Sequence, residues 1–160
     1  MAAGGLRDGD VQALAYYADR GRIHAADPLD GPRQAFAAWR EDLAAGRRSL
    51  LLAGTTETVH MLNLQAQADH LQAHPEVLAG PSALLAGDEQ AWVGDVIVTR
   101  RNQRRLTTGG ADFVKNRDRW IVTHVYPDGS LQATRLGVPE TVILPAEYVR
   151  QHAELGYAST

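Results

Sequence analysis

The hydrophobic pattern of this chain changes period after Pro75, and that change limits the folds open to it. Before Pro75, apolar residues recur at the three- and four-residue spacing of amphipathic helices. From Trp92 onward, apolar and polar residues alternate, which is typical of strands with one buried face. The pattern therefore predicts a helix-rich α/β part followed by a β-rich part.

The first part is predicted to hold three helices and a buried strand. The spacing indicates helices over residues 8–20, 30–46 and 55–74, a short strand at 22–24 and a continuous apolar strand at 49–54. Pro32 suits a first helical turn, and Phe36 and Trp39 lie on the apolar side of that helix as expected core residues. A strand buried on both faces between helices indicates a parallel α/β sheet.

The second part is predicted to be a small β-barrel. Strands are expected at 95–99, 119–126, 130–136 and 141–144, and residues 80–90 are interpreted as a linker. Pro127-Asp128-Gly129 has the residues of a hairpin turn. A short helix is expected at 146–152, and residues 156–160 begin another strand. This order suggests a barrel inserted between two parts of an α/β domain.

Composition excludes several kinds of site. The 160 residues carry a net charge of −3, so any nucleic-acid surface has to be a local patch. The chain has no cysteine, which excludes disulfides, thiolate chemistry and the usual zinc sites. No apolar run approaches the ~18 residues of a membrane span. A phosphate-binding G-x-x-x-x-G-K-[ST] loop, a Ser-His-Asp set and paired carboxylates are also missing, so no catalytic residue is predicted.

The densest cationic stretch of the chain contains Arg100, Arg101, Arg104 and Arg105. Residues 100–119 hold seven basic and two acidic side chains, a local net charge of +5. Such a patch suits contact with phosphates, with an affinity that falls as salt rises. The alternative is a solvated loop. Asn102 could bond to sugar or phosphate, but capping of the loop is favoured.

Several other polar and aromatic residues have two interpretations. Thr55 and Thr56 follow the buried strand, where a hydroxyl at a helix N-terminus either contacts phosphate or caps the helix. Asn63 is expected to be structural, and Trp120 is expected in the barrel core rather than as a platform for a base. His70 and His74 have a metal-binding spacing, but no third ligand lies nearby, so a solvated helix face is favoured.

Three stretches, taken in order, carry a resemblance to a known family. The first is residues 50–56 followed by Val59 and Leu62-Asn63. The second combines residues 94–98, Asn102 and residues 114–120, and the third is residues 156–160. Together they resemble the second RecA-like domain of a superfamily 1B DNA helicase of the RecD/TraI type. The helicase part of actinobacterial TrwC/TraI conjugative relaxases is the most similar member.

The resemblance implies a fold class and a division of the chain. That class is α/β, a partial RecA-like P-loop-NTPase-type parallel sheet interrupted by a small SH3-like β-barrel. Residues 6–78 would be the RecA-like part, 84–146 the barrel, and 147–160 the return to the α/β domain. The family's Asn-Gly-Asp-x-Gly turn is replaced here by residues 116–120, with Arg117 at the glycine position.

The resemblance also implies a function. The chain would be a fragment of an ATP-dependent DNA helicase acting in plasmid transfer in the bacterial cytoplasm, contributing contacts to single-stranded DNA. ATP and Mg would belong to the full-length protein, whose first motor domain would be the partner of this part. The implied nucleic-acid-binding residues are Arg100, Arg101, Asn102, Arg104, Arg105, Lys115, Thr55, Thr56 and Thr160. The alternative is a protein-interaction module whose groove is lined by Trp92, Trp120, Tyr126 and Tyr148.

Overall fold

The computed structural model describes residues 15, 18–19, 27, 30–109 and 112–160. The strand expected at 22–24 and most of the helix expected at 8–20 lie outside the described residues. The helix-rich part consists of α3 (Gly31–Ala44), β1 (Leu51–Leu52) and α4 (Thr56–Ala73). These elements confirm the two helices expected after residue 30. The strand expected at 49–54 is present only as Leu51–Leu52, and its expected burial on both faces is wrong, because Leu51 is buried whereas Leu52 is 60% exposed.

Strand β1 pairs in parallel with β11 (Ala158–Ser159) at the other end of the described chain, in the register Leu51 with Ala158 and Leu52 with Ser159. Helix α4 packs beside this pair and buries Val59, Leu62 and Ala66, which follow helical spacing. Among the described residues this is the only parallel pairing. The structure therefore provides no evidence for the larger RecA-like sheet that the resemblance implied.

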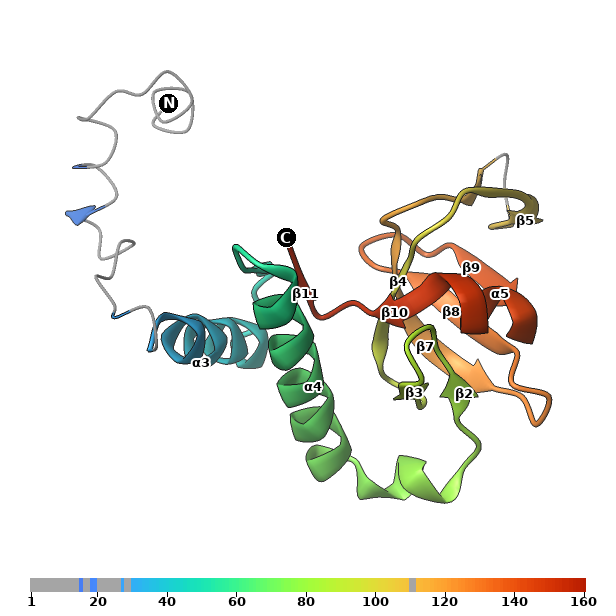
Figure 1. Ribbon diagram of the computed structural model, residues 1–160, viewed down its shortest axis with the longest axis horizontal. Helices are drawn as coiled ribbons and strands as arrows, with labels where there is room; N and C mark the ends of the chain where they lie inside the picture. Colours follow the sequence, from blue (N-terminus) through green and yellow to red (C-terminus); the bar gives the residue numbers. More distant parts are fainter. Residues whose placement is uncertain (1–14, 16–17, 20–26, 28–29, 110–111) are drawn as a thin grey trace.

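The chain between α4 and β11 forms a β-rich unit, residues 83–155, which lies to one side of the helices (Figure 1). It is reached through the 3-10 turn η1 (Pro75–Ala79). Its strands are β2 (Ala83–Leu84), β3 (Gln90–Ala91), β4 (Val96–Thr99), β5 (Gln103–Thr107), β6 (Phe113–Val114), β7 (Arg119–Val125), β8 (Leu131–Arg135), β9 (Thr141–Leu144) and, after helix α5 (Ala146–His152), β10 (Ala153–Leu155).

The main sheet of this unit has the antiparallel order β10-β4-β7-β8-β9. The four strands and the short helix expected from the alternating pattern are confirmed, and so is the hairpin turn, in which Gly129 has φ 84°. Trp120 is fully buried in the core of the unit, which confirms its expected role. Its indole Nε1 donates to Thr99 Oγ1 at 3.3 Å.

The interpretation of residues 80–90 as a linker is wrong. They contain β2 and the start of β3, paired as an antiparallel hairpin in which Ala83 and Leu85 are buried. The turn uses positive φ at Gly87 (83°) and Asp88 (65°). Strands of two residues are too short for alternation to be visible in the sequence. After α5 the chain also pairs once more with β4 through β10 before it reaches β11.

Buried polar contacts join the β-rich unit to the helices. The fully buried Asp95 carboxylate accepts hydrogen bonds from Gln67 Nε2 at 2.7 Å, from the Trp92 amide at 2.9 Å and from the Tyr157 hydroxyl. Asn63 on α4 donates to the Leu155 carbonyl and accepts from the Ala158 amide, which confirms a structural role. Burial and the adjacent Asp95 raise the pKa of Tyr157, so its hydroxyl remains a donor.

Candidate nucleic-acid interface

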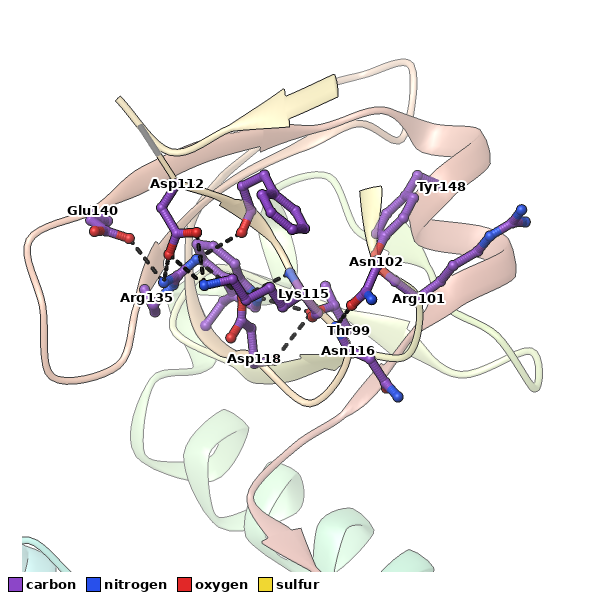
Figure 2. A network of polar contacts seen from close by, with 12 residues as sticks. Thr99, Arg101, Asn102, Asp112, Lys115, Asn116, Asp118, Arg135, Glu140 and Tyr148 are labelled. Carbon is purple, nitrogen blue, oxygen red and sulfur yellow. Dashed lines mark hydrogen bonds and ion pairs between the residues drawn. The ribbon is translucent and has the colours of Figure 1, made fainter. Parts of the chain in front are cut away.

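The arginine-rich segment forms the β4–β5 connection and the first half of β5, and internal hydrogen bonds hold it in place (Figure 2). Thr99 Oγ1 donates to the Lys115 carbonyl at 2.6 Å, and Asn102 Oδ1 accepts from the Asn116 amide at 2.8 Å. The Tyr148 hydroxyl donates to the Arg101 carbonyl. Burial raises the pKa of Tyr148, which keeps that donor protonated. Asn102 therefore caps the loop, as favoured from the sequence.

The four arginines of this segment point to different surroundings. Arg100 forms an ion pair with Glu154 at 2.7 Å. Arg101 places a guanidinium nitrogen 3.3 Å from His152 Nε2, and Figure 2 shows its side chain extending away from the acidic residues. Arg104 stacks over the Phe113 ring, 5.1 Å from its centroid. Arg105 has no ion pair with any described residue.

The remaining basic residues of the stretch are largely occupied. Lys115 Nζ pairs with Asp112 at 2.8 Å. Arg135, on β8, pairs with Asp112, Asp118 and Glu140 at 2.9 to 3.1 Å (Figure 2). Arg119 is half-buried and donates to main-chain carbonyls. The cationic surface is therefore smaller than the local charge of +5 indicates. On the β4–β5 segment its unneutralised part is Arg101, Arg104 and Arg105, and outside that segment Arg117 also has no ion pair with a described residue.

Two of these arginines line a groove beside α5. Arg101 and Arg105 come from the β4–β5 segment, and Tyr148 and His152 come from the helix. The groove has a volume of about 380 Å³, and Glu147 is the one carboxylate in its lining. Two guanidinium groups along an open groove suit contacts to consecutive phosphates, because each offers several N–H donors in a planar fork.

The threonines implied by the resemblance lie near the ends of β1 and β11. Thr55 Oγ1 accepts from the Thr58 amide at 3.2 Å and caps α4, so the capping interpretation is borne out. Thr56 lines a cavity of about 330 Å³ that also includes Arg100 and Glu154. Thr160 follows β11 and is exposed, and the adjacent Ser159 carbonyl accepts from the Ala53 amide. The parallel pairing thus brings Thr55, Thr56 and Thr160 toward one end of the strand pair.

The structure gives little support to a metal site at His70 and His74 or to the aromatic groove of the alternative interpretation. His70 Nε2 lies 3.0 Å from the Val93 carbonyl, and the described residues contain no group of three or more acidic or histidine side chains that could hold a metal. The aromatic groove of the alternative interpretation is not formed, because Trp120 is fully buried and Tyr148 is largely buried. None of the described helices combines the length and apolar character needed to cross a membrane.

Sequence reasoning missed two features of the structure. Asp95 was noted only as part of a motif, yet it is the buried acceptor that joins α4, β4 and the segment before β11. Arg48 was not noted, because it stands alone between α3 and β1, far in sequence from the basic residues beside which it folds. Neither has a local signal beyond a charged residue next to an apolar run.

The β-rich unit has a recognisable family. Residues 84–154 match the family model described as the Rv2311 SH3-like barrel domain. The unit is therefore an SH3-like barrel, called the barrel below, and the match includes α5 and most of β10. Neither a search of curated proteins nor a search of solved structures found a match to this chain.

Proposed function

We propose that this chain binds single-stranded nucleic acid through the barrel surface formed by Arg101, Arg104 and Arg105. The observation that carries the proposal is that these three guanidinium groups have no carboxylate partner among the described residues, although the chain as a whole is acidic. Solvated cations on one rigid loop attract phosphates and release counterions on binding. Lys115 and Arg135 differ from these three arginines, because both are neutralised by ion pairs with Asp112 inside the barrel.

The rigidity of the segment supports the same function. The Tyr148 hydroxyl holds the Arg101 carbonyl and the Asn116 amide holds the Asn102 side chain, so little conformational freedom of the segment is lost when a ligand binds. The groove beside α5 gives the strand a path past Arg101 and Arg105.

The wider setting that we propose is a motor protein. A barrel placed between β1–α4 and β11 agrees with the order of a second helicase domain of the RecD/TraI type. In that setting Thr55, Thr56 and Thr160 would contact DNA at the end of the strand pair, and the rest of a conjugative relaxase would supply ATP, Mg and the first motor domain. The described residues contribute DNA contacts and no catalytic group.

The test is fluorescence anisotropy of a labelled oligothymidylate titrated with the chain at several salt concentrations. We expect binding whose affinity falls with salt, by a slope of about −0.7 per phosphate contacted. The double variant Arg101→Gln/Arg105→Gln should bind more weakly, with a slope shallower by about 1.4. Arg33→Gln is the matched control, because Arg33 is exposed on α3 and has no ion pair with a described residue.

Two results would overturn the proposal. One is an equal loss of affinity in the Arg33→Gln control, which would mean that only net charge matters. The other is binding that does not change with salt. An absence of oligonucleotide binding together with capture of a defined protein partner would favour the interaction-module alternative.

A further inference from the structure

A second cationic site lies on a different side of the molecule. A cleft of about 540 Å³ separates the barrel from the connection between α3 and β1. It is lined by residues that precede β1, including Arg48 and Leu50, and by Arg117 and Arg119 of the barrel. Thr55 and Thr56 follow β1, so this cleft lies toward the opposite end of the strand pair. None of the residues proposed above to bind nucleic acid lines it.

Three arginines of the cleft lining have no carboxylate partner among the described residues. Arg48 and Arg117 are exposed and form no ion pair with a described residue. Arg119 is half-buried, and its donors reach only the Gly156 carbonyl at 2.7 Å and the Tyr157 carbonyl at 3.1 Å. Desolvation lowers the pKa of Arg119, but an arginine stays charged. A partly buried charge without a counter-ion is costly, so an anion bound here would be stabilised.

The acidic residues near these three arginines already form ion pairs with other arginines. Asp118 is the one carboxylate in the lining, and it pairs with Arg135 at 3.0 Å. Arg47, also in the lining, pairs with Asp42 at 2.8 Å. The protein therefore leaves the charges of Arg48, Arg117 and Arg119 for a ligand.

The cleft lining also contains exposed apolar side chains. Leu43, Leu50 and Leu136 are 46%, 68% and 37% exposed there, which is high for leucines that line a common cleft. Behind them Trp39 and Tyr157 pack edge to face, with ring centroids 6.4 Å apart. A flat apolar group would cover these leucines and remove them from water.

Local backbone geometry keeps two of the arginines at the cleft. Arg117 has φ 71°, a left-handed conformation that is strained for a non-glycine residue. Arg48 reaches across the cleft to Gly137, where an added Cβ would lie 2.4 Å from its Nη2 atom. Gly137 has φ 86°, and this positive φ disfavours a side chain there, whereas the nearby Arg48 guanidinium is the end of a flexible side chain that can move.

We propose that this cleft binds an amphipathic anion of nucleotide size, with a phosphate held by Arg48, Arg117 and Arg119 and a flat base against Leu43, Leu50 and Leu136. The volume lies in the range of small-molecule sites, about 300–1,000 Å³. Guanidinium groups match phosphate by bidentate hydrogen bonds. The site does not depend on the nucleic-acid surface proposed above, because the two share no residue.

The experiment uses adenosine 5′-monophosphate as the probe and NMR as the readout. Two signals report on the cleft alone, the Trp39 indole N–H and the Arg119 Nε–H, which is hydrogen-bonded to Gly156. We expect both to shift and saturate during a titration to about 10 mM, which covers dissociation constants near 1 mM. Adenosine alone and inorganic phosphate alone should each bind at least roughly tenfold more weakly, since each keeps one half of the contacts.

Three variants locate the site. Arg48→Gln/Arg117→Gln should weaken binding of the probe roughly tenfold or more, as expected for loss of charged hydrogen bonds. Arg117→Gly removes one of these two charges and relieves the positive φ, so it tests the charge without the backbone strain of the arginine. Arg101→Gln/Arg105→Gln is the matched control and should leave binding of the probe unchanged.

A 5′-phosphorylated and an unphosphorylated oligothymidylate identify the source of the ligand. Competition by the phosphorylated oligonucleotide alone indicates the end of a strand, and competition by neither indicates a free nucleotide. Either result agrees with the proposal. It is overturned if neither reporter signal shifts, if adenosine binds as tightly as the monophosphate, or if the control variant loses as much binding as Arg48→Gln/Arg117→Gln. Failure here leaves the oligonucleotide titration at Arg101 and Arg105 unaffected, so the two proposals fail separately.

Discussion

The two cationic regions of this molecule differ in how their charges are arranged. The β4–β5 segment has four arginines within six positions, yet they diverge toward Glu154, His152, Phe113 and solvent. The cleft between the barrel and the α3–β1 connection draws arginines from distant segments, and they converge on one volume. A run of basic residues in a sequence therefore suits an extended polyanion, whereas a compact anion site depends on the tertiary structure.

The largest effect on stability is expected at Asp95, whose buried hydrogen bonds join the barrel to α4 and to Tyr157. Asp95→Ala removes the acceptor of the Trp92 amide and of the Tyr157 hydroxyl, and Gln67 Nε2 keeps only the Gln90 carbonyl at 2.8 Å. We expect unfolding by urea to show a loss of about 3 kcal/mol or more. Glu41→Ala on the exposed face of α3 is the control and should change stability by less than about 0.5 kcal/mol.

This substitution also separates the two regions. Tyr157 lines the cleft, whereas the arginine segment is held by Asn116 and Tyr148. In conditions where the Asp95→Ala variant remains folded, the probe should dissociate from the cleft more readily while oligonucleotide binding is retained. An equal loss of both would show that the two surfaces are not independent.

The next largest effect is the loss of stability at low pH, which depends on Asp112. The Lys115 and Arg135 side chains lower the pKa of Asp112 below its usual value near 3.8. Asp112 therefore contributes stability that is present above pH 3.8 and is lost as the pH falls toward its lower folded-state pKa. Asp112→Asn should flatten the acid side of a stability profile below about pH 4, where the wild type loses stability. A profile that stays unchanged would contradict the ion pairs seen in Figure 2.

The same variant sharpens the comparison at neutral pH. Without Asp112, Lys115 has no ion pair, and it lies on the same side of the barrel as Arg104, since both approach the Phe113 ring. The salt slope for oligonucleotide binding should steepen by about 0.7, the value for one more phosphate contact. Binding of the probe in the cleft should not change, and a change there would mean that Asp112 also tunes Arg119 or Arg117.

Much of the barrel and of the helix-rich part follows from local sequence signals. The apolar spacing of α4, Pro32 at the start of α3 and the Pro127-Asp128-Gly129 turn are each sufficient to place an element. The β2–β3 hairpin was missed because its strands are two residues long. Its stability comes from burial of Ala83 and Leu85 against the rest of the barrel, which no local pattern reports.

The candidate sites are less accessible to sequence reasoning than the fold is. The charge of Arg100 is neutralised by Glu154, and that of Arg135 by Asp112 and Glu140, and only the tertiary structure brings these partners together. Counting charges along residues 100–119 consequently overestimates the free cationic surface. The same limitation hides the cleft, since Arg48 precedes the barrel in the sequence whereas Arg117 lies within it.

The smallest effect tests why an arginine occupies position 117 at all. At φ 71° a glycine is less strained than an arginine. The Arg117→Gly variant should therefore be at least as stable as the wild type in urea unfolding, with a gain of at most about 1 kcal/mol. The loss of backbone entropy on folding a glycine offsets part of that gain. If the variant is at least as stable as the wild type but loses the probe, the strained arginine is retained for the ligand. If it is less stable, the Arg117 side chain has a packing role, and the inference that a strained arginine is kept there for the ligand is wrong.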